Sequence, residues 1–218
     1  MAKRPVFIAN ENISEYVEEK EIDFVWFPGL SKAQKQKSVE SLHKAFIQQN
    51  QDLKVLEISS KSLQPIGVNL SAFNLILSHK NRTFSVETAF QSSKVFELGG
   101  PYLDLLTKSA RDAKTDERLK SSGKLIYFSF FDQKWFLEPK TAFYDWLYLN
   151  AVSQNVALAD KIMEYSAFTD IEFNPQKSIN CQARSAALFV SLKRKGILEN
   201  VLNTPEEFLK HLETRRNV

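Results

Sequence analysis

The sequence has one cysteine, few glycines and prolines, and no long hydrophobic run. Six Gly and seven Pro in 218 residues are too few for a collagen-like or low-complexity chain. Cys181 alone cannot form an internal disulfide or a cysteine-rich metal site, which is typical of a reducing compartment. The longest aromatic and aliphatic stretch, Leu125 to Phe131, has seven residues, whereas a membrane span needs about 20. The apolar run from Pro5 to Ala9 is also too short for a signal peptide, so we expect a cytoplasmic protein without membrane contact.

The charge balance likewise gives no strong indication of a partner. The chain carries 29 Lys and Arg against 26 Asp and Glu, a formal net charge of +3. Its basic residues cluster in a few places, the largest cluster being Lys108, Arg111, Lys114, Arg118, Lys120 and Lys124. Acidic residues are interleaved with this cluster, which favours ion pairs on a helix surface over a nucleic-acid-binding patch.

Composition and patterning predict one α+β domain over residues 1–218, rich in helix and with a small β-sheet. Hydrophobic residues make up 43% of the chain and charged residues 25%, and no linker-like segment divides it. Strands are expected at residues 6–8, 22–27, 53–58, 70–77, 125–131, 134–137 and 171–173. Helices are expected at residues 31–49, 85–98, 102–107, 140–165 with a break near 153–155, 180–195 and from 204 onwards.

The helix expected at 85–98 carries an unusual set of polar residues. Ser85 is a good N-cap, and Gly99 with Gly100 ends the pattern. At 100° per residue, Glu87, Gln91 and Lys94 share one side of this helix. The residues alone favour a solvent-facing ladder that stabilises the helix, and a functional site is the second interpretation.

The motifs of common catalysts are missing from the sequence. It contains no phosphate-binding P-loop, no dinucleotide-binding glycine fingerprint, no zincin helix and no nucleophile elbow. The histidines, His43, His79 and His211, are scattered, which disfavours a His-rich metal site or a Ser-His-Asp triad. We therefore expect neither a metal nor a cofactor.

Two segments together resemble a known family. Leu70-Ser71-Ala72-Phe73-Asn74, followed by Glu87-Thr88-Ala89-Phe90-Gln91-Ser92-Ser93-Lys94, resembles the core of the NADAR (YbiA-like) superfamily, whose members carry Ser-x-Phe and then Glu-x-x-Phe/Tyr-Gln-x-x-Lys. Further segments are similar to the branch associated with DarT-type DNA ADP-ribosyltransferases: residues 34–38, 57–62, 93–97, 99–102, 143–148 and 178–185. The branch differs from ordinary NADAR proteins at Thr88, where His is frequent, and at residues 180–182.

The resemblance implies a NADAR-like fold and an antitoxin that acts as an ADP-ribosyl glycohydrolase. Such an enzyme removes ADP-ribose that a DarT-type toxin has placed on guanine bases of DNA, so ADP-ribosylated DNA and that toxin are the implied partners. Positive charge develops at the ribose anomeric carbon during cleavage, and a carboxylate such as Glu87 stabilises it. Lys94 is the candidate nucleophile at this carbon, or alternatively stabilises the diphosphate charge.

A wider set of residues is expected to bind the substrate, each with a structural role as the alternative. Ser71 belongs to the Ser-x-Phe segment. The candidates for stacking on a base are Trp26, Phe73 and Trp146. The candidates for hydrogen bonds to ribose or base are Asn74, Gln91, Asp145 and Asn180. The candidates for contacts with the diphosphate or the DNA backbone are Lys35, Lys61 and Arg184.

Two other functions stay open on the sequence. The first is an N-glycosidase acting on a small ribosylated metabolite, such as a riboflavin-pathway intermediate. The second is a binding module that recognises ADP-ribose or the toxin without chemistry. Dependence of activity on DNA separates the first from the antitoxin hydrolase, and neutralisation that survives loss of Glu87 and Lys94 identifies the second.

Overall fold

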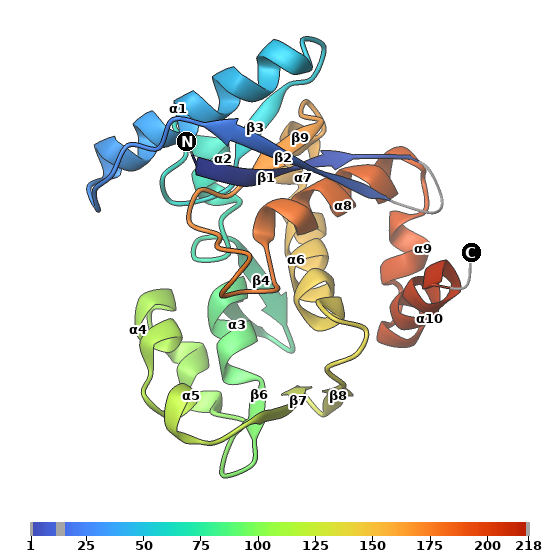
Figure 1. Ribbon diagram of the computed structural model, residues 1–218. Helices are drawn as coiled ribbons and strands as arrows, with labels where there is room; N and C mark the ends of the chain where they lie inside the picture. The colour runs from blue at the N-terminus through green and yellow to red at the C-terminus, as the bar shows by residue number, and fades with distance from the viewer. Residues whose placement is uncertain (1, 12–15, 217–218) are drawn as a thin grey trace.

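The upper part of the molecule is a four-stranded sheet between two helices. The computed structural model describes residues 2–11 and 16–216. In spatial order the strands are β2 (Val17–Phe24), β1 (Ala2–Ala9), β9 (Ala167–Thr169) and β3 (Val55–Glu57). β1 runs antiparallel to both of its neighbours, and β3 pairs with β9 in parallel. Helix α1 (Lys32–Gln49) covers one face of the sheet, and α8 (Gln182–Arg194) lies on the other (Figure 1).

The alternation of side chains along β1 explains this three-layer arrangement. Val6 and Ile8 point to one face and pack in a core cluster with Leu42 and Phe46 of α1. Phe7 points to the opposite face and belongs to the larger core. Since successive strand residues face opposite sides, a strand with apolar residues at consecutive positions must be buried on both faces.

The lower part holds short strands and helices from the middle of the chain. β4 (Ile76–His79) and β5 (Arg82–Ser85) form a hairpin, and a second small sheet has the order β6-β7-β8. The strands of this second sheet are β6 (Lys94–Phe96), β7 (Leu125–Phe130) and β8 (Gln133–Trp135). The helices here are α3 (Val86–Ser92), the 3₁₀ helix η1 (Leu103–Thr107), α4 (Ala110–Thr115) and α5 (Arg118–Ser121). Helix α2 (Pro65–Asn69) lies in the upper part, where Gly67 approaches the carbonyl of Glu57 in β3 (Figure 1).

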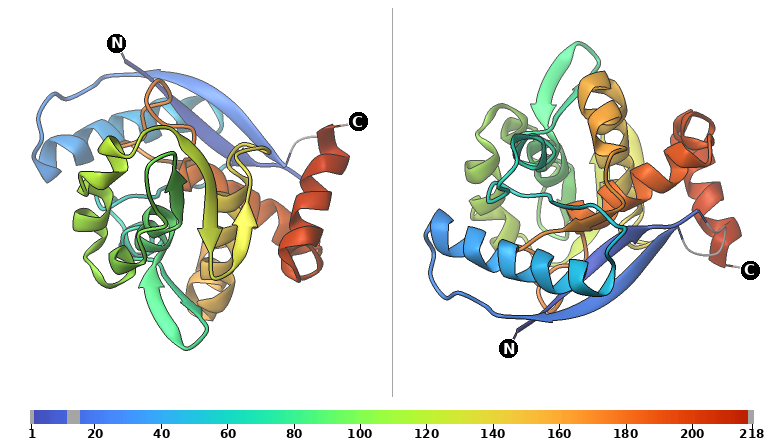
Figure 2. Two further views of the ribbon diagram at one scale, coloured as in Figure 1. Left: turned by 90° about the horizontal axis from the view of Figure 1, so that it is seen from below. Right: turned by 90° about the horizontal axis from the view of Figure 1, so that it is seen from above.

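Helix α6 (Ala142–Gln154) connects the two parts through the middle of the large core. It packs against both α3 and α8, and nine of its residues are buried. α7 (Val156–Ile162) follows it after Asn155, and α9 (Leu198–Leu202) and α10 (Pro205–Arg216) close the chain beside it (Figure 2). The predicted α+β fold is confirmed, with strands divided among small sheets. In the described ranges we find no helix long and apolar enough to cross a membrane.

The prediction of one helix from 85 to 98 is wrong in its second half. α3 ends at Ser92, and Lys94 opens strand β6, which pairs with β7. The hydroxyls of Ser92 and Ser93 both donate to the carbonyl of Ala89, at 3.0 and 2.7 Å. Serines that bond to the backbone in this way destabilise a helix interior. The residues that follow, from Lys94 to Phe96, instead form hydrogen bonds with β7.

Two predicted strands are also corrected. Residues 70–75 form turns after α2, and extended structure begins only at Ile76, because the side chains of Ser71 and Asn74 bond to the carbonyl of Val68. The strand expected at 171–173 is found earlier, as β9 at 167–169. Ile171 lies outside this strand, because its N–H donates to the Glu57 carboxylate rather than to a neighbouring strand. Short apolar segments of this kind are the hardest to assign from periodicity alone.

Candidate active site

Helix α3 buries the polar residues that the sequence singled out. Ser85 caps the helix by accepting a hydrogen bond from the N–H of Thr88 at 3.1 Å. All residues of α3 are buried, and Glu87 and Gln91 are only 5% and 6% exposed. The interpretation of these residues as a solvent-facing ladder is therefore wrong. A carboxylate and an amide held inside a protein need a reason beyond helix stability, because their burial costs free energy.

The carboxylate of Glu87 has two polar neighbours. Nε2 of Gln91, one turn further along α3, donates to Oε1 of Glu87 at 2.8 Å. Nζ of Lys114, from α4, lies 3.8 Å from the same oxygen. Oε1 of Gln91 is buried without a hydrogen-bond partner among the described residues. An unpaired buried acceptor costs about 1–3 kcal/mol, and such costs are concentrated at functional sites.

Lys94 lies next to this pair, at the start of β6 rather than on α3. Its Nζ is 4.9 Å from the centroid of the Phe90 ring. Burial lowers the pKa of Lys94 to about 8; the charge of Glu87 opposes this shift, and the charge of Lys114 adds to it. A lysine whose pKa is lowered in this way is partly unprotonated near neutral pH, as an amine nucleophile must be.

A lysine nucleophile beside a carboxylate is subject to two opposing effects on its pKa. A carboxylate in close contact with Lys94 would keep its amine protonated. Within the described residues, however, Lys114 rather than Lys94 is the ion-pair partner of Glu87. Lys94 therefore retains a lowered pKa although Glu87 is close.

The turn after α2 holds α3 in place. The backbone N–H of Glu87 donates to the carbonyl of Ala72 at 2.9 Å. Ser71 donates to the carbonyl of Val68 at 2.7 Å, and Asn74 donates to Oγ of Ser71 at 3.1 Å. These two side chains thus shape the turn, whereas Phe73 is half-buried with its ring centroid 5.0 Å from Nζ of Lys114.

A half-buried carboxylate, Asp170, is connected to the same turn through the side-chain amide of Gln182. Nε2 of Gln182 donates to Oδ2 of Asp170 at 2.9 Å, and Oε1 of Gln182 accepts from the N–H of Ala72 at 2.7 Å. Burial raises the pKa of Asp170, and the hydrogen bonds from Gln182 and from the backbone N–H of Glu172 partly oppose this shift. Hydrogen bonds therefore run from Asp170 through Gln182 and Ala72 to the backbone of Glu87.

The comparisons with known proteins place the chain in a family. Residues 2–217 match the model of the family described as DarT1-associated NADAR antitoxin. The chain belongs to this family of NADAR antitoxins. A search of curated proteins finds no match. The protein is accordingly an antitoxin against a toxin of the DarT kind, and the resemblance stated from residues 70–74 and 87–94 is confirmed.

In this NADAR antitoxin, Asp145 and Arg184 lie together at a buried junction of α6 and α8. Oδ2 of Asp145 accepts from Oγ1 of Thr141 at 2.7 Å and from Nη1 of Arg184 at 3.0 Å. Oδ1 accepts from Oγ of Ser185 at 2.6 Å. The protein itself thus supplies hydrogen bonds to both oxygens, while Arg184 is partly exposed.

Trp26 and Lys35 form a separate group beside the large sheet. Nζ of Lys35 lies 4.8 Å from the centre of the Trp26 ring and 3.2 Å from Oε1 of Glu172. Glu172 in turn donates its backbone N–H to Asp170 at 3.0 Å. Trp26 and Lys35 are therefore linked through Glu172 to Asp170, and no contact among the described residues joins either of them to Lys94.

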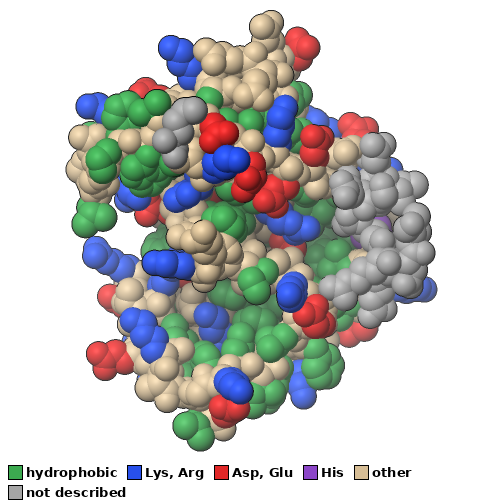
Figure 3. Space-filling model, viewed as in Figure 1, with side chains coloured by type: hydrophobic (Ala, Val, Ile, Leu, Met, Phe, Trp, Pro, Cys, Tyr) green, Lys and Arg blue, Asp and Glu red, His purple; other side chains and the backbone are tan. Residues whose placement is uncertain are grey.

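The remaining predicted site residues lie in different surroundings. Trp146 packs against Trp135 and Phe130 with its Nε1 buried, as a core residue does. Lys61 is half-buried on the segment after β3. Asn180 is half-buried and lines a cavity together with Phe90. The face that Figure 3 shows is hollowed near its centre, with hydrophobic side chains inside and Lys and Arg side chains around it.

The sequence interpretation of the NADAR antitoxin missed Lys114, a direct neighbour of Glu87, and Asp170, which is linked to the backbone of Glu87 through Gln182 and Ala72. Lys114 was assigned to the basic cluster of surface ion pairs, which holds for Arg118, whose Nη2 lies 2.7 Å from Asp104. Lys114 instead points to Glu87, and only the three-dimensional packing of α4 against α3 reveals it. Asp170 sits between a strand and a turn without any recognisable motif.

Proposed function

We propose that this antitoxin is an ADP-ribosyl glycohydrolase that removes ADP-ribose from guanine bases of DNA, with Glu87 and Lys94 as its catalytic residues. The observation that carries the proposal is a buried carboxylate beside a lysine whose pKa burial lowers to about 8. Strongly shifted lysines beside buried carboxylates are concentrated at catalytic sites. The family's association with a DarT1 toxin supports ADP-ribosylated DNA as the substrate class.

The proposed chemistry uses the unprotonated amine of Lys94. Its nitrogen forms a bond to the anomeric carbon of the ribose as the bond from that carbon to the ring oxygen breaks, and the ring oxygen takes up one proton from the Lys94 nitrogen. The bond from the carbon to the guanine nitrogen then breaks, and its electron pair goes to that nitrogen. The guanine nitrogen takes up a proton as it leaves, and the carbon remains joined to Lys94 as an imine. Water then adds to the imine, releasing ADP-ribose and restoring the amine.

Glu87 supports each of these steps by its charge and by its capacity to carry a proton. Positive character at the anomeric carbon and at the imine is stabilised by a nearby carboxylate in a site of low dielectric constant. Gln91 orients that carboxylate through its 2.8 Å hydrogen bond. General acid–base transfer of this kind contributes about 10²–10⁴-fold to a rate.

The test is release of ADP-ribose from a single-stranded oligonucleotide that carries ADP-ribosylated guanine. The wild-type protein is compared with Lys94→Ala and with Glu87→Gln, with and without a chelator. We expect turnover by the wild-type protein in both conditions and loss of turnover in both variants. Retention of full activity by Lys94→Ala would remove the covalent mechanism.

The same assay separates the alternatives. A metabolite N-glycosidase would cleave a small N-ribosylated compound and leave the oligonucleotide intact. A binding module would bind ADP-ribose without releasing it from DNA, and Lys94→Ala would still neutralise the toxin in cells. Either result would overturn the proposed reaction.

A further inference from the structure

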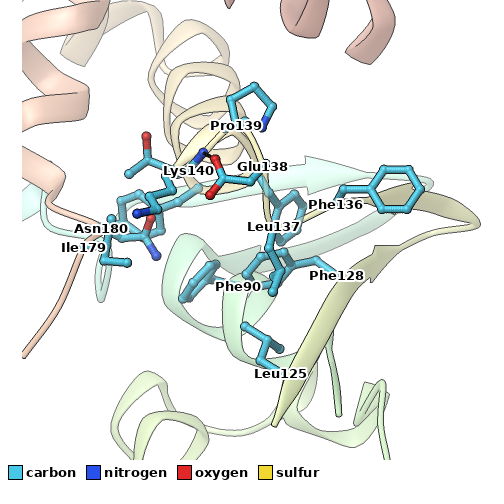
Figure 4. Close-up of a pocket in the computed structure, with 14 residues that line it drawn as sticks. Phe90, Leu125, Phe128, Phe136, Leu137, Glu138, Pro139, Lys140, Ile179 and Asn180 are labelled. Atoms are coloured by element: carbon cyan, nitrogen blue, oxygen red, sulfur yellow. Dashed lines mark hydrogen bonds between the residues drawn. The ribbon is translucent and has the colours of Figure 1, made fainter. Parts of the chain in front are cut away.

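A cavity of about 280 Å³ opens between the β7–β8 hairpin, the start of α6 and the segment before α8. Its walls are mostly aromatic and aliphatic. The apolar side chains that line it include Phe90, Leu125, Phe128, Phe136, Leu137 and Ile179. Figure 4 shows several of these side chains facing the cavity from β7, from α3 and from the segment that follows β8.

The cavity lies beside Lys94. Phe90, whose ring centroid is 4.9 Å from Nζ of Lys94, forms part of its wall. Phe128, another wall residue, is the direct partner of Lys94 in the β6–β7 pairing. Directly paired residues of antiparallel strands project to the same face of the sheet, so the side chain of Lys94 is on the cavity side of this sheet.

Polar groups are few and are confined to one end. Asn180, Lys140 and Glu138 lie together there, away from Phe136 (Figure 4). The side-chain amide of Asn180 makes no hydrogen bond to any described residue, so it can both donate to a ligand and accept from one. An apolar cavity with a small number of polar groups at one end is typical of a site for a planar aromatic ligand.

We propose that this cavity holds the purine base from which ADP-ribose is removed. The inference rests on the proposed function, which places the anomeric carbon at Lys94. That carbon is bonded directly to the leaving base, whereas the adenine of ADP-ribose is separated from it by two riboses and a diphosphate. The group in the cavity next to Lys94 is therefore the leaving base, packed against the aromatic walls and hydrogen-bonded to Asn180.

A base bound in this cavity determines whether the DNA around it is single-stranded or duplex. A base within this cavity cannot remain stacked and paired in a duplex, so it must be flipped out or already single-stranded. Because flipping costs free energy, a single-stranded substrate is expected to react faster than the same sequence in a duplex.

The test uses two variants of the cavity and one matched control. Leu137→Arg obstructs the cavity at a side chain that is 38% exposed, so folding is preserved. Leu30→Arg makes the same substitution at a residue that is 95% exposed and does not line the cavity. Both substitutions raise the net charge of the protein by one, so both variants have the same change in net electrostatic attraction to DNA. Asn180→Ala is the second cavity variant and removes only an amide.

Two quantities are measured for each protein: kcat/KM on the single-stranded guanine-linked oligonucleotide, and the Kd of ADP-ribose, which lacks the leaving base. We expect Leu137→Arg to lower kcat/KM by roughly 10-fold or more, in line with the loss of stacking on one base, and to leave the Kd within about 2-fold. Asn180→Ala should give a smaller loss of kcat/KM in the same direction. Leu30→Arg should match the wild-type protein in both quantities.

Three outcomes would overturn the assignment. Equal loss of ADP-ribose affinity and kcat/KM in Leu137→Arg would mean that the cavity holds the adenosine end of the substrate. Unchanged kcat/KM in both Leu137→Arg and Asn180→Ala, with an active wild-type protein, would mean that the cavity is not used, while the proposed function stands. No turnover by the wild-type protein would overturn the proposed function and this assignment together.

Discussion

Nζ of Lys114 lies 3.8 Å from Oε1 of Glu87, across the contact between α4 and α3. This ion pair also affects Lys94, because the charge of Lys114 lowers the pKa of Lys94. Lys114 therefore acts on the proposed nucleophile in two ways. It competes for the carboxylate that would otherwise favour the protonated amine, and it repels the proton on Lys94.

The pH dependence of turnover follows from the pKa of Lys94. Since the unprotonated amine is the reacting form and its pKa is about 8, kcat/KM should rise as the pH increases through this value. Lys114→Gln should move the midpoint upwards by roughly half a unit to one unit, because one positive charge is lost nearby. Lys114→Arg keeps the charge and should keep the midpoint. A pH profile that is the same in all three proteins would contradict this coupling.

Replacing the buried carboxylate tests its chemical role. Glu87→Gln retains an oxygen that can accept from Gln91, but removes the negative charge and the ability to carry a proton. We expect kcat to fall by about 10²–10⁴-fold, while the melting temperature changes little. Steady-state kinetics and thermal unfolding on the same preparations give the two numbers. A large loss of stability with unchanged kcat would make Glu87 a structural residue.

Asp145 is expected to stabilise the fold rather than to act on the substrate. Its carboxylate accepts hydrogen bonds from Thr141, Arg184 and Ser185. Asp145→Ala leaves Thr141 and Arg184 without this acceptor, and leaves Ser185 only its longer bond to the carbonyl of Cys181, so it should lower the free energy of unfolding by about 1–3 kcal/mol. Denaturant unfolding measures this loss. If stability were unchanged and the Kd of ADP-ribose increased instead, Asp145 would be a substrate-binding residue.

The sequence predicted the local elements with strong end signals. Ser31 caps α1 by accepting from the N–H of Gln34, and Thr204 accepts from the N–H of Glu207 at the start of α10, so both helices begin where they were expected. The expected hairpin of β7 and β8 is also formed, with its turn at Phe131 and Asp132, one residue earlier than the expected ranges place it. Caps and turns are decided by a few neighbouring residues, so a sequence shows them directly.

The site could be predicted only in part, for a reason seen at Lys94. The motif named Glu87, Gln91 and Lys94, but helical periodicity extended the helix past the point where β6 pairs with β7. The pairing partner lies more than thirty residues later, at Phe128, and no local signal reports it. Likewise, burial of the polar face of α3 depends on packing from η1, α4 and α6, which the sequence pattern does not contain.

A third buried carboxylate, Glu57, should make stability depend on pH. Burial, with the nearby Asp170 charge, raises the pKa of Glu57 above its ordinary value of 4.5, although hydrogen bonds from Ser59, Thr169 and Ile171 oppose the shift. The folded state then binds a proton that the unfolded state releases. The free energy of unfolding contributed by this group is complete below pH 4.5 and is lost as the pH rises toward the raised value.

Glu57→Gln removes this ionisation and keeps the side-chain shape. Between about pH 5 and pH 8, the range over which the raised pKa of Glu57 makes the wild-type protein lose stability, the free energy of unfolding of this variant should vary less than that of the wild-type protein. Urea unfolding at several pH values measures the difference, and Glu40→Gln, a substitution on the exposed side of α1, is the control. A steeper loss of stability in Glu57→Gln than in the wild-type protein would contradict the raised pKa.

The most direct test of the account is to trap the covalent intermediate. The protein is mixed with the guanine-ADP-ribosylated oligonucleotide, reduced with borohydride and analysed by mass spectrometry of its peptides. We predict an ADP-ribose adduct on Lys94, absent from Lys94→Ala and from samples without borohydride. Turnover by the wild-type protein with no adduct on Lys94, or an adduct on another residue, would contradict catalysis by this lysine.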